Sequence, residues 1–488
     1  MKLTPRDFQR YDLDRLKAHN YRALLNQETG SGKTVTSVLA HVESGSDVTL
    51  VIAPDQTHRS AWIPTLEAVG VEGRIIGNSN KSTKVAYQDF LLGFPGVYIT
   101  TPQWFTRTDS SEWSGDLLLI DESHGLMAPQ SRGQRALSGY TAKETSEALV
   151  QRFDGRMSLS GTALRNRFEL AWSQGRTLWP ELNKRGQIAH DNHYAWLIDR
   201  MNYTEVYTGK RDQWGAPKKA RKYYGETVPG RWISEVPLAI THYKRRRCCE
   251  FHPDGFLPMA EPTVVHETIT LAPAQKKAVK ELEASMMTYL GENALVCDIP
   301  LTKATRVRQM TLGVPTMTYD DAGVEEVTFE DDCVSPYLDW LMGFLDESDE
   351  TVLVLTDSQR FAKVTTNRLN AAGISAFEYS GATRGTRAND AALFGTKYRV
   401  LVGVLAALAE GFDGLQSVCK TEVWLNTSLD GTINTQMEGR LDRIGQKDQI
   451  MRIYLHDDLG LSEGRFSEAV EKRLQLNRSL RVATPAHT

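Results

Sequence analysis

The chain has 488 residues, of which 41% are apolar and 24% are charged. This length exceeds what one hydrophobic core usually holds, so at least two domains are expected, and the composition is that of a globular protein rather than a disordered or fibrous one. The formal net charge of −4 excludes a uniformly basic surface, so any contact with nucleic acid must come from local basic patches.

The N-terminus carries no apolar signal region, and the sequence contains no run of about 18 apolar residues that could span a membrane. The five cysteines are odd in number and show no paired CxxC spacing. This usage fits a reducing compartment better than a disulfide framework or a zinc site. We therefore expect a cytoplasmic protein without a membrane segment.

Short apolar runs alternate with helix-length segments in the first third of the chain. These runs are 48–54, 96–102, 117–121 and 157–162. Continuous apolar runs are typical of parallel strands covered on both faces, and ligands then bind at the carboxyl ends of the strands. The sequence predicts an α/β fold with a parallel sheet.

Residues 28–34 form a glycine-rich phosphate loop. Gly30 and Gly32 let backbone N–H groups approach phosphates, Lys33 reaches the β- and γ-phosphates, and the Thr34 hydroxyl can bind Mg²⁺. The alternative is a flexible turn before a helix. The predicted ATP-binding residues of this loop are Thr29, Gly30, Ser31, Gly32, Lys33 and Thr34.

An acidic pair, Asp121 and Glu122, follows the apolar run 117–120. Asp121 is expected to hold Mg²⁺, usually through water, and Glu122 to orient or deprotonate an attacking water. Acidic pairs also cap helices in many proteins. Because this pair follows a phosphate loop in the right order, it favours an ATPase.

Four segments together resemble the Swi/Snf family of superfamily two helicase-like ATPases: 28–34, 52–54 followed by Trp62, 121–124, and 159–166. The resemblance implies two RecA-like lobes. It further implies that Ser160, Gly161 and Thr162 couple the nucleotide site to nucleic acid. It also implies that Gln9 binds the adenine edge, whereas the alternative for Gln9 is a solvated side chain.

The alternation of apolar runs and helix-length segments is absent between about residues 182 and 310. In the resembled family this region holds helical protrusions and the linker between the lobes. Its middle is basic and carries interleaved aromatic residues, as in surfaces that touch a phosphate backbone and stack on bases. A solvated loop is the alternative. The predicted nucleic-acid contacts here are Lys218, Lys219, Arg221 and Lys222.

A second α/β pattern, without a second phosphate loop, occupies the runs 351–356, 398–403 and 422–426. That asymmetry is what a motor with one nucleotide site between two lobes requires. Arg440 and Arg443 are three apart in a segment predicted to be helical, so they fall on one face and can point to the same cleft.

The resemblance identifies Arg440 and Arg443 as arginine fingers, which stabilise the charge on the transferring phosphoryl group. Plain surface charge is the alternative for such a pair. Gln436, in the same motif, is assigned to coupling, and Asp413 to the nucleotide site. Candidate contacts to the nucleic-acid backbone are Thr101, Thr383 and Arg384, for which simple loop capping is the alternative.

The sequence predicts a first RecA-like lobe at 1–181, helical protrusions and a linker at 182–330, a second lobe at 331–456, and a brace helix and tail at 457–488. We expect a monomeric translocase that uses ATP and Mg²⁺ and moves on DNA, with double strands preferred and single strands possible. The absence of accessory domains suggests a compact bacterial or viral protein. The alternatives are a strand-separating DNA helicase or RNA helicase, and an ATP-gated factor that clamps or loads on DNA without moving.

Overall fold

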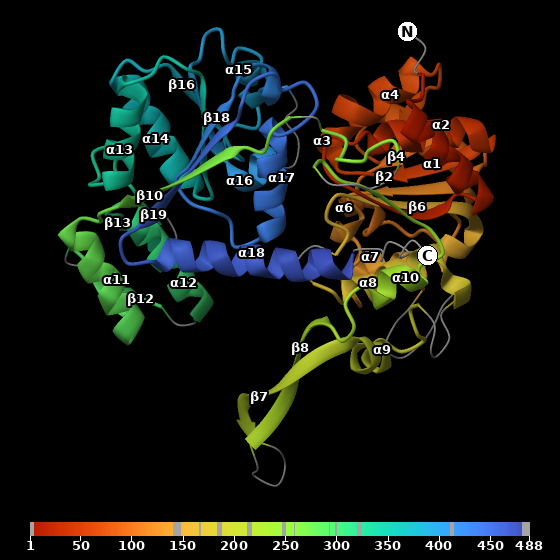
Figure 1. Ribbon diagram of the computed structural model, residues 1–488, viewed down its shortest axis with the longest axis horizontal. Helices are drawn as coiled ribbons and strands as arrows, with labels where there is room; N and C mark the ends of the chain where they lie inside the picture. Colours follow the sequence, from red (N-terminus) through yellow and green to blue (C-terminus); the bar gives the residue numbers. More distant parts are fainter. Residues whose placement is uncertain are drawn as a thin grey trace. The chain divides into compact units, whose positions relative to one another are not determined.

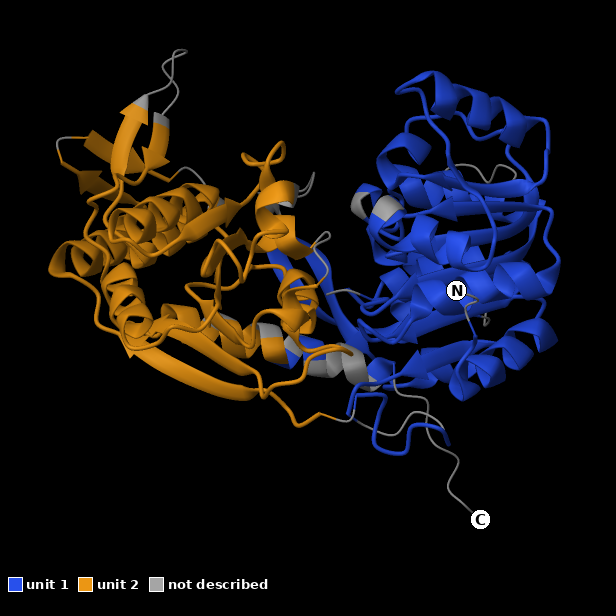
Figure 2. Cartoon of the chain, turned by 90° about the horizontal axis from the view of Figure 1, so that it is seen from above, with its two compact units in different colours: residues 1–258, 471–488 blue, residues 259–470 orange. Residues whose placement is uncertain are grey.

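The computed structural model of the chain comprises two compact units (Figure 2). Unit 1 contains residues 1–258 and 471–488, and unit 2 contains residues 259–470. The structure describes residues 4–139, 148–164, 167–182, 188–211, 217–245, 250–257, 259–291, 293–297, 300–319, 325–409 and 414–480. The finer division into four segments stays a prediction.

Unit 1 is built on a sheet of seven parallel strands (Figure 1). In spatial order these are β3 (Gly73–Ile75), β4 (Gly96–Thr100), β2 (Val48–Ile52), β5 (Gly115–Asp121), β6 (Phe153–Ser160), β1 (Arg22–Gln27) and β9 (Ala239–His242). Its longer helices are α1 (Asp7–Ala18), α2 (Lys33–Ser44), α4 (Ile63–Ala68), α5 (Lys81–Leu91), α7 (Arg132–Ser138), α8 (Leu170–Leu178) and α9 (His193–Arg200).

Short helical turns complete unit 1. They are α3 (Asp55–Thr57), η1 (His58–Trp62), α6 (Pro102–Phe105), η2 (Ser123–Gly125), η3 (Leu149–Arg152), η4 (Pro180–Leu182) and α10 (Arg231–Glu235).

Both faces of this sheet are covered. Along β5, Leu118 and Ile120 are buried in one hydrophobic cluster, whereas Leu117 and Leu119 are buried in another. Successive side chains of a strand point to opposite faces, so a strand between two layers of helices needs apolar residues at every position. The continuous apolar runs of the sequence therefore predicted this sheet correctly.

The segment expected to form helical protrusions also contains a long antiparallel hairpin, β7 (Met201–Arg211) and β8 (Pro217–Glu226), which projects from the rest of unit 1 beside α9 (Figure 1). Strand formation follows from the β-branched and aromatic residues between 203 and 207 and at 223–224, which favour extended backbone. The helical expectation was therefore incomplete for this stretch.

Unit 2 contains a second parallel sheet, of six strands. In spatial order these are β10 (Thr263–Ile269), β19 (Met451–Asp457), β18 (Thr421–Trp424), β15 (Val352–Thr356), β17 (Val400–Val404) and β16 (Ala376–Tyr379). Alternate residues of β15 again enter two different clusters, since Val352 and Val354 pack on one side and Leu353 and Leu355 on the other. The prediction of two parallel α/β lobes is confirmed.

The remaining elements of unit 2 are helices and two small hairpins. The helices are α11 (Pro273–Ser285), α12 (Pro300–Leu312), α13 (Pro336–Asp346), α14 (Gln359–Ala371), α15 (Arg387–Ala391), α16 (Leu405–Ala409), η5 (Leu415–Ser417) and α17 (Gly431–Leu441). The hairpins are β11 (Met287–Leu290) with β12 (Asn293–Val296), and β13 (Thr316–Tyr319) with β14 (Glu325–Thr328).

The expected C-terminal helix is present as α18 (Leu461–Ser479). The boundary between the units falls inside it, so residues 461–470 belong to unit 2 and the rest to unit 1. Cys297, Cys333 and Cys419 are buried free thiols, as their spacing predicted. Among the described helices, none combines the length and the apolar character needed to cross a bilayer.

Candidate functional site

The phosphate loop joins the end of β1 to the start of α2. Gly30 and Gly32 adopt φ angles of +87° and +93°, which residues with a Cβ rarely accept. A Cβ on Gly32 would also lie 3.2 Å from Gln9 Nε2. Because the first N–H groups of α2 face this loop without helical partners, the loop can hold an anionic phosphate group.

Lys33 begins α2, and its side chain turns back over the loop. Its Nζ donates a hydrogen bond of 2.9 Å to the Gln27 carbonyl, and Ser31 Oγ donates one of 3.3 Å to Gln27 Oε1. Thr29 and Thr34 are half-buried beside them. The loop is thus held in shape by its own polar groups while the ammonium group stays at its rim.

Gln9 lies on α1 and is only 4% exposed. Its Nε2 donates to Thr36 Oγ1 at 3.3 Å, and its Oε1 accepts from the Arg6 backbone N–H at 3.1 Å. The alternative of a solvated glutamine is therefore wrong. Contact with an adenine edge stays a prediction.

A buried histidine–aspartate contact that sequence reasoning missed lies next to this loop. His242 Nε2 is 2.7 Å from Asp12 Oδ2, and both side chains are buried. His242 ends β9 directly beside Gln27, and its carbonyl accepts from the Glu28 N–H at 3.0 Å. No local signal could have found this pair, because its members are 230 residues apart in the sequence.

Asp121 is the last residue of β5 and is buried. Trp62 Nε1 donates to its Oδ2 at 3.0 Å, and the Glu122 N–H donates to its Oδ1 at 3.0 Å. Burial, with the charge of Glu122 adding to it, raises the pKa of Asp121 to about 6, although the Trp62 hydrogen bond and the Lys33 charge act in the opposite direction. A cation bound next to Asp121 would therefore stabilise its ionised form and lower its pKa.

Glu122 adopts a left-handed backbone conformation, with φ 44° and ψ 45°. This conformation is uncommon for a residue other than glycine and is found mostly where the surrounding structure enforces it. Its Oε2 lies 3.3 Å from His124 Nδ1 and 3.5 Å from Ser160 Oγ. The same His124 nitrogen is 3.1 Å from Ser160 Oγ and 3.5 Å from Thr162 Oγ1.

Strand order explains why residues 160–162 reach both halves of the site. β6 lies between β1 and β5, and Ser160 is in register with Asn26 at the end of β1. A Cβ on Gly161 would lie 3.1 Å from the Gln27 carbonyl and 3.5 Å from the Thr29 nitrogen, so a larger residue would crowd the phosphate loop. The motif contacts the acidic pair through Ser160 and the phosphate loop through Gly161.

Gln174 on α8 supports this arrangement and was missed in the sequence. Its Nε2 donates to Ser123 Oγ at 3.1 Å and to the Ala163 carbonyl at 3.3 Å, and its Oε1 accepts from Ser158 Oγ at 2.6 Å. Because both the oxygen and the nitrogen of this buried amide are hydrogen-bonded, Gln174 holds the loops that follow β5 and β6 in place. A glutamine inside a helical segment gives no sequence signal that it will hold two loops together.

The sequence predicted that the two candidate arginines of unit 2 lie on one helix face. This prediction is wrong. α17 ends at Leu441, so Arg440 lies in its last turn and Arg443 lies in the segment after it. The helix ends because Asp442 leaves helical geometry at ψ 73°, and Gly445 then takes φ +101°. Arg440 donates to the Ala409 carbonyl, and Arg443 is half-buried.

Gln436 lies on α17 and is half-buried. Asp413, predicted to belong to the nucleotide site, lies outside the described residues.

A buried polar network anchors α17 to the sheet of unit 2. Tyr454 OH donates to Glu438 Oε1 at 3.2 Å, and Arg452 Nη2 donates to the Glu438 carbonyl at 2.9 Å. Arg452 also forms an ion pair with Glu422, which is fully buried. Burial raises the pKa of Glu422 to about 7, although Arg452 opposes that rise. The helix that carries Gln436 and Arg440 is therefore fixed by charged groups on β18 and β19.

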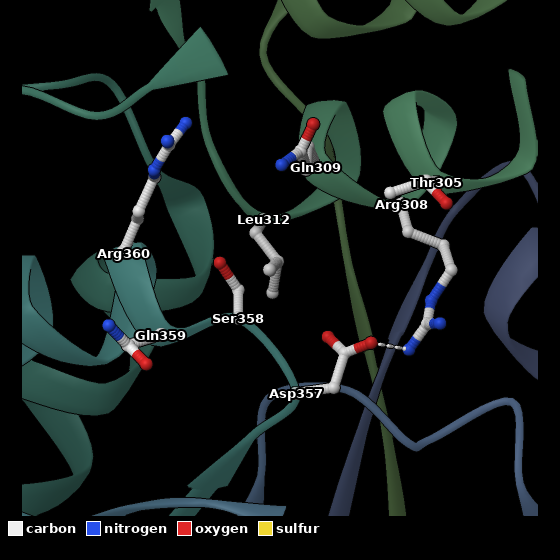
Figure 3. A pocket seen from close by; sticks show the side chains of 8 residues that line it. All are labelled: Thr305, Arg308, Gln309, Leu312, Asp357, Ser358, Gln359 and Arg360. Carbon is white, nitrogen blue, oxygen red and sulfur yellow. Dashed lines mark ion pairs between the residues drawn. The ribbon is translucent and has the colours of Figure 1, made fainter. Parts of the chain in front are cut away.

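A polar pocket of about 310 Å³ lies at the carboxyl end of β15 (Figure 3). Arg308 from α12 forms an ion pair with Asp357, and the Asp357 N–H donates to Asn426 Oδ1 at 2.9 Å. The other lining residues are Thr305, Gln309, Leu312, Ser358, Gln359 and Arg360. Sequence reasoning did not identify this pocket, because its two sides are separated along the chain.

The candidate backbone contacts serve local structure as well. Thr101 caps α6 by accepting from the Trp104 N–H at 3.1 Å, and Thr383 Oγ1 donates to the Glu378 carbonyl at 3.0 Å. Both hydroxyls thus perform the capping that the sequence left open as an alternative. Arg384 is exposed.

The candidate lysines and arginine of the hairpin, Lys218, Lys219, Arg221 and Lys222, all lie exposed on β8.

Within the described ranges, no three His, Cys, Asp or Glu side chains gather into a metal-binding group. The phosphate site offers the Thr34 hydroxyl and the Asp121 carboxylate instead. Two oxygen ligands from the protein are enough for Mg²⁺, because its other ligands are water molecules and phosphate oxygens of a bound nucleotide. These residues therefore fit a Mg²⁺–nucleotide complex.

Residues 2–164 match the family model described as "Type III restriction enzyme, res subunit", and the matched segment includes the phosphate loop, the acidic pair and residues 160–162. No curated protein sequence matches the chain. One similar solved structure is the SWI2/SNF2 ATPase core of Sulfolobus solfataricus in complex with dsDNA, with 15% identity, a TM-score of 0.39, and coverage of 100% of this chain and 98% of that chain. Residues 2–164, which carry the phosphate loop and the acidic pair, are thus similar to the res subunit of type III restriction enzymes.

Proposed function

We propose that the protein is an ATP-driven translocase of the Swi/Snf type that moves on double-stranded DNA. The observation that carries this proposal is the continuous contact from the phosphate loop through Gly161 and Ser160 to Glu122. A change at the loop when nucleotide binds or is hydrolysed would therefore act directly on residues 160–162. A motor needs such a link, whereas a plain nucleotide-binding protein does not.

ATP binds in unit 1. The backbone N–H groups of residues 29–32 surround the phosphates, and Lys33 leaves the Gln27 carbonyl to bind the β- and γ-phosphates. Gln9, adjacent to Gly32, faces the base. Thr34 and Asp121 hold Mg²⁺, which neutralises charge on the phosphate oxygens when it is bound.

Glu122 orients the attacking water and accepts its proton. Its carboxylate is held by contacts with His124 and Ser160. Arg440 and Arg443 supply positive charge to the transferring phosphoryl group, and the contacts of α17 with β19 hold the helix that carries Arg440 in place within unit 2. Asp413 and Gln436 complete the nucleotide and coupling sites.

DNA contacts come from loops at strand ends and from the hairpin of unit 1. Thr101, Thr383 and Arg384 lie at such loops, and Lys218, Lys219, Arg221 and Lys222 give β8 a strong positive charge. Polyanions bind such clusters through phosphate contacts that carry no base identity. This local charge supports nucleic acid as the partner although the whole chain is slightly acidic.

A second candidate is a helicase that separates strands. The projecting hairpin favours it, because exposed tyrosines on β7 and β8 are suited to contact with unpaired bases. An ATP-gated clamp that does not move is a third possibility, which the experiment below also tests.

The test compares ATPase stimulation by duplex DNA, single-stranded DNA and RNA, followed by displacement of a third strand from a triplex and by unwinding of a forked duplex. A duplex translocase is stimulated most by duplex and displaces the third strand without opening the fork. Fork opening supports the strand-separating helicase instead. Stimulation without either movement identifies a clamp and refutes the proposal.

A further inference from the structure

The β7–β8 hairpin has two chemically different faces. Residues 203, 205 and 207 of β7 lie opposite Tyr223, Arg221 and Lys219 of β8, whereas Thr204 lies opposite Lys222. Since successive side chains of a strand alternate between faces, the basic cluster read from the sequence is divided between the two sides.

We call the first side the tyrosine face. It consists of Tyr203, Glu205, Tyr207, Lys219, Arg221 and Tyr223.

Both cations of the tyrosine face are already engaged there. Lys219 Nζ lies 2.9 Å from Glu205 Oε2 and 5.6 Å from the centre of the Tyr207 ring. Arg221 Cζ lies 4.4 Å from the centre of the Tyr203 ring. The cations therefore hold the two aromatic rings in position, and the net charge of the face is only one positive unit. Phosphate contacts of Lys219 and Arg221 therefore account for only part of what this face can offer a nucleic acid.

The rings of the tyrosine face are nevertheless exposed. Tyr207 is 70% and Tyr203 is 42% exposed, although large aromatic side chains usually gain from burial. Tyr203 and Tyr223 lie 5.9 Å apart between ring centres. Beside them, Tyr194 from α9 helps to line a shallow pocket of about 370 Å³ with Glu205, Lys219, Arg221 and Tyr223. Exposed rings held by cations form a platform on which a flat ring can stack.

The opposite side carries Lys218, Lys222 and Tyr224, all exposed. Among the side chains described on this side, one aromatic ring accompanies two lysines, which suits contact with a phosphate backbone. Across the described hairpin residues the cations exceed the carboxylates, which makes the surface complementary to a polyanion. A ligand with both negative charge and flat rings would match the lysines of this side and the rings of the tyrosine face.

We propose that the tyrosine face is a binding site for unpaired nucleotides, whose bases stack on Tyr203 and Tyr207. In a duplex the bases are stacked on each other and do not reach such a surface, whereas single strands expose them. This inference rests on the proposed function only in taking nucleic acid as the partner. It assigns to the hairpin a single-strand site that is distinct from the opposite side with Lys218 and Lys222.

The test measures binding of a fluorescein-labelled oligothymidylate and of a labelled blunt duplex to the full chain without nucleotide, at several salt concentrations. The variant Tyr203→Ala with Tyr207→Ala is expected to bind the single strand about tenfold or more weakly, because each stacked base contributes on the order of tenfold. Its salt dependence and its duplex affinity stay unchanged. The variant Tyr203→Phe with Tyr207→Phe keeps the rings and is expected to bind like the wild type.

Tyr224→Ala provides the matched control, since it removes a tyrosine that is 50% exposed on the opposite side. It is expected to leave single-strand affinity unchanged. Lys218→Ala with Lys222→Ala is expected to weaken duplex binding and to reduce its salt slope by up to about two units. Equal losses for the Tyr224 and the Tyr203/Tyr207 variants, or unchanged affinity in the latter, would overturn the inference.

Competition with polyglutamate tests the other class of acidic partner. If the Tyr203/Tyr207 substitutions weaken the binding of polyglutamate as much as that of the single strand, the face recognises acidic groups rather than stacked bases and the inference is wrong. Because all of these measurements omit ATP, they remain decisive even if the enzyme proves not to move on DNA. Conversely, failure of the stacking result leaves the ATPase and translocation assays unaffected.

Discussion

Replacement of Trp62 by phenylalanine should shift the pH dependence of ATP hydrolysis. The Trp62 indole N–H donates to the buried Asp121 carboxylate at 3.0 Å, and phenylalanine has no donor to replace it. A hydrogen bond to a charged group contributes about 1.5–3 kcal/mol. Since one pKa unit corresponds to about 1.4 kcal/mol, its loss should raise the pKa of Asp121 by roughly one to two units.

The direction of the effect on activity follows from the chemistry of the ligand. In the proposed mechanism a protonated Asp121 does not hold Mg²⁺, so we expect ATP hydrolysis to be lost as the pH falls through the pKa of Asp121, which is about 6 in the wild type. In Trp62→Phe the same loss should occur at a pH between about 7 and 8. The assay is the steady-state ATPase rate from pH 5.5 to 9 at a Mg²⁺ concentration well below saturation, where ion binding limits the rate.

Stability gives an independent readout of the same group. The pKa of Asp121 is raised in the folded state from an ordinary 3.8, so its contribution to stability is fully present below pH 3.8 and is lost as the pH rises through about 6. In Trp62→Phe without nucleotide or metal, this loss should continue to higher pH. Chemical denaturation at pH 5 and pH 8 measures it.

The matched control is Trp196→Phe, which removes an equally buried indole whose N–H donates to the Ile188 carbonyl at 2.9 Å. This variant loses comparable packing but should keep the wild-type pH profile. If the acid limbs of all three proteins coincide, Trp62 does not control the ionisation of Asp121, and the reasoning fails.

Four further substitutions test the ATP site and helix α17. Lys33→Ala should abolish ATP hydrolysis while DNA binding without nucleotide survives, and a near-normal ATPase rate in the folded variant would contradict the role of Lys33. Glu122→Gln should retain ATP affinity by calorimetry but block hydrolysis, because an amide cannot accept the proton of water; a loss of affinity as large as that of Lys33→Ala would indicate a structural role instead. Arg440→Ala should lower kcat by a factor on the order of 10³ with a smaller effect on ATP affinity. Tyr454→Phe, which removes only the hydrogen bond to Glu438, should lower kcat by a smaller factor and leave ATP affinity intact, and unchanged kcat in both variants would show that α17 does not act in catalysis.

The residues of the phosphate loop and the acidic pair were identifiable because their chemistry depends on short local patterns. Positive φ angles at Gly30 and Gly32 need glycine, and a strand covered on both faces needs an unbroken apolar run before Asp121. Where the local pattern was mixed, prediction was poorer. The segment of the β7–β8 hairpin is polar enough to resemble a helical surface, and the end of α17 before Arg443 depends on the conformation of Asp442.

The sequence by itself determined the parallel α/β sheets, the phosphate loop and the order of the motifs, because these depend on residue type and near neighbours. Only the tertiary structure decided which distant residues meet. The position of β6 between β1 and β5 brings Ser160 to Glu122, and β9 brings His242 to Asp12 across 230 residues. Likewise, strand pairing separates Lys219 and Arg221 from Lys218 and Lys222. Contacts of this kind depend on sheet order and register, which the packing of the whole chain selects and no local pattern encodes.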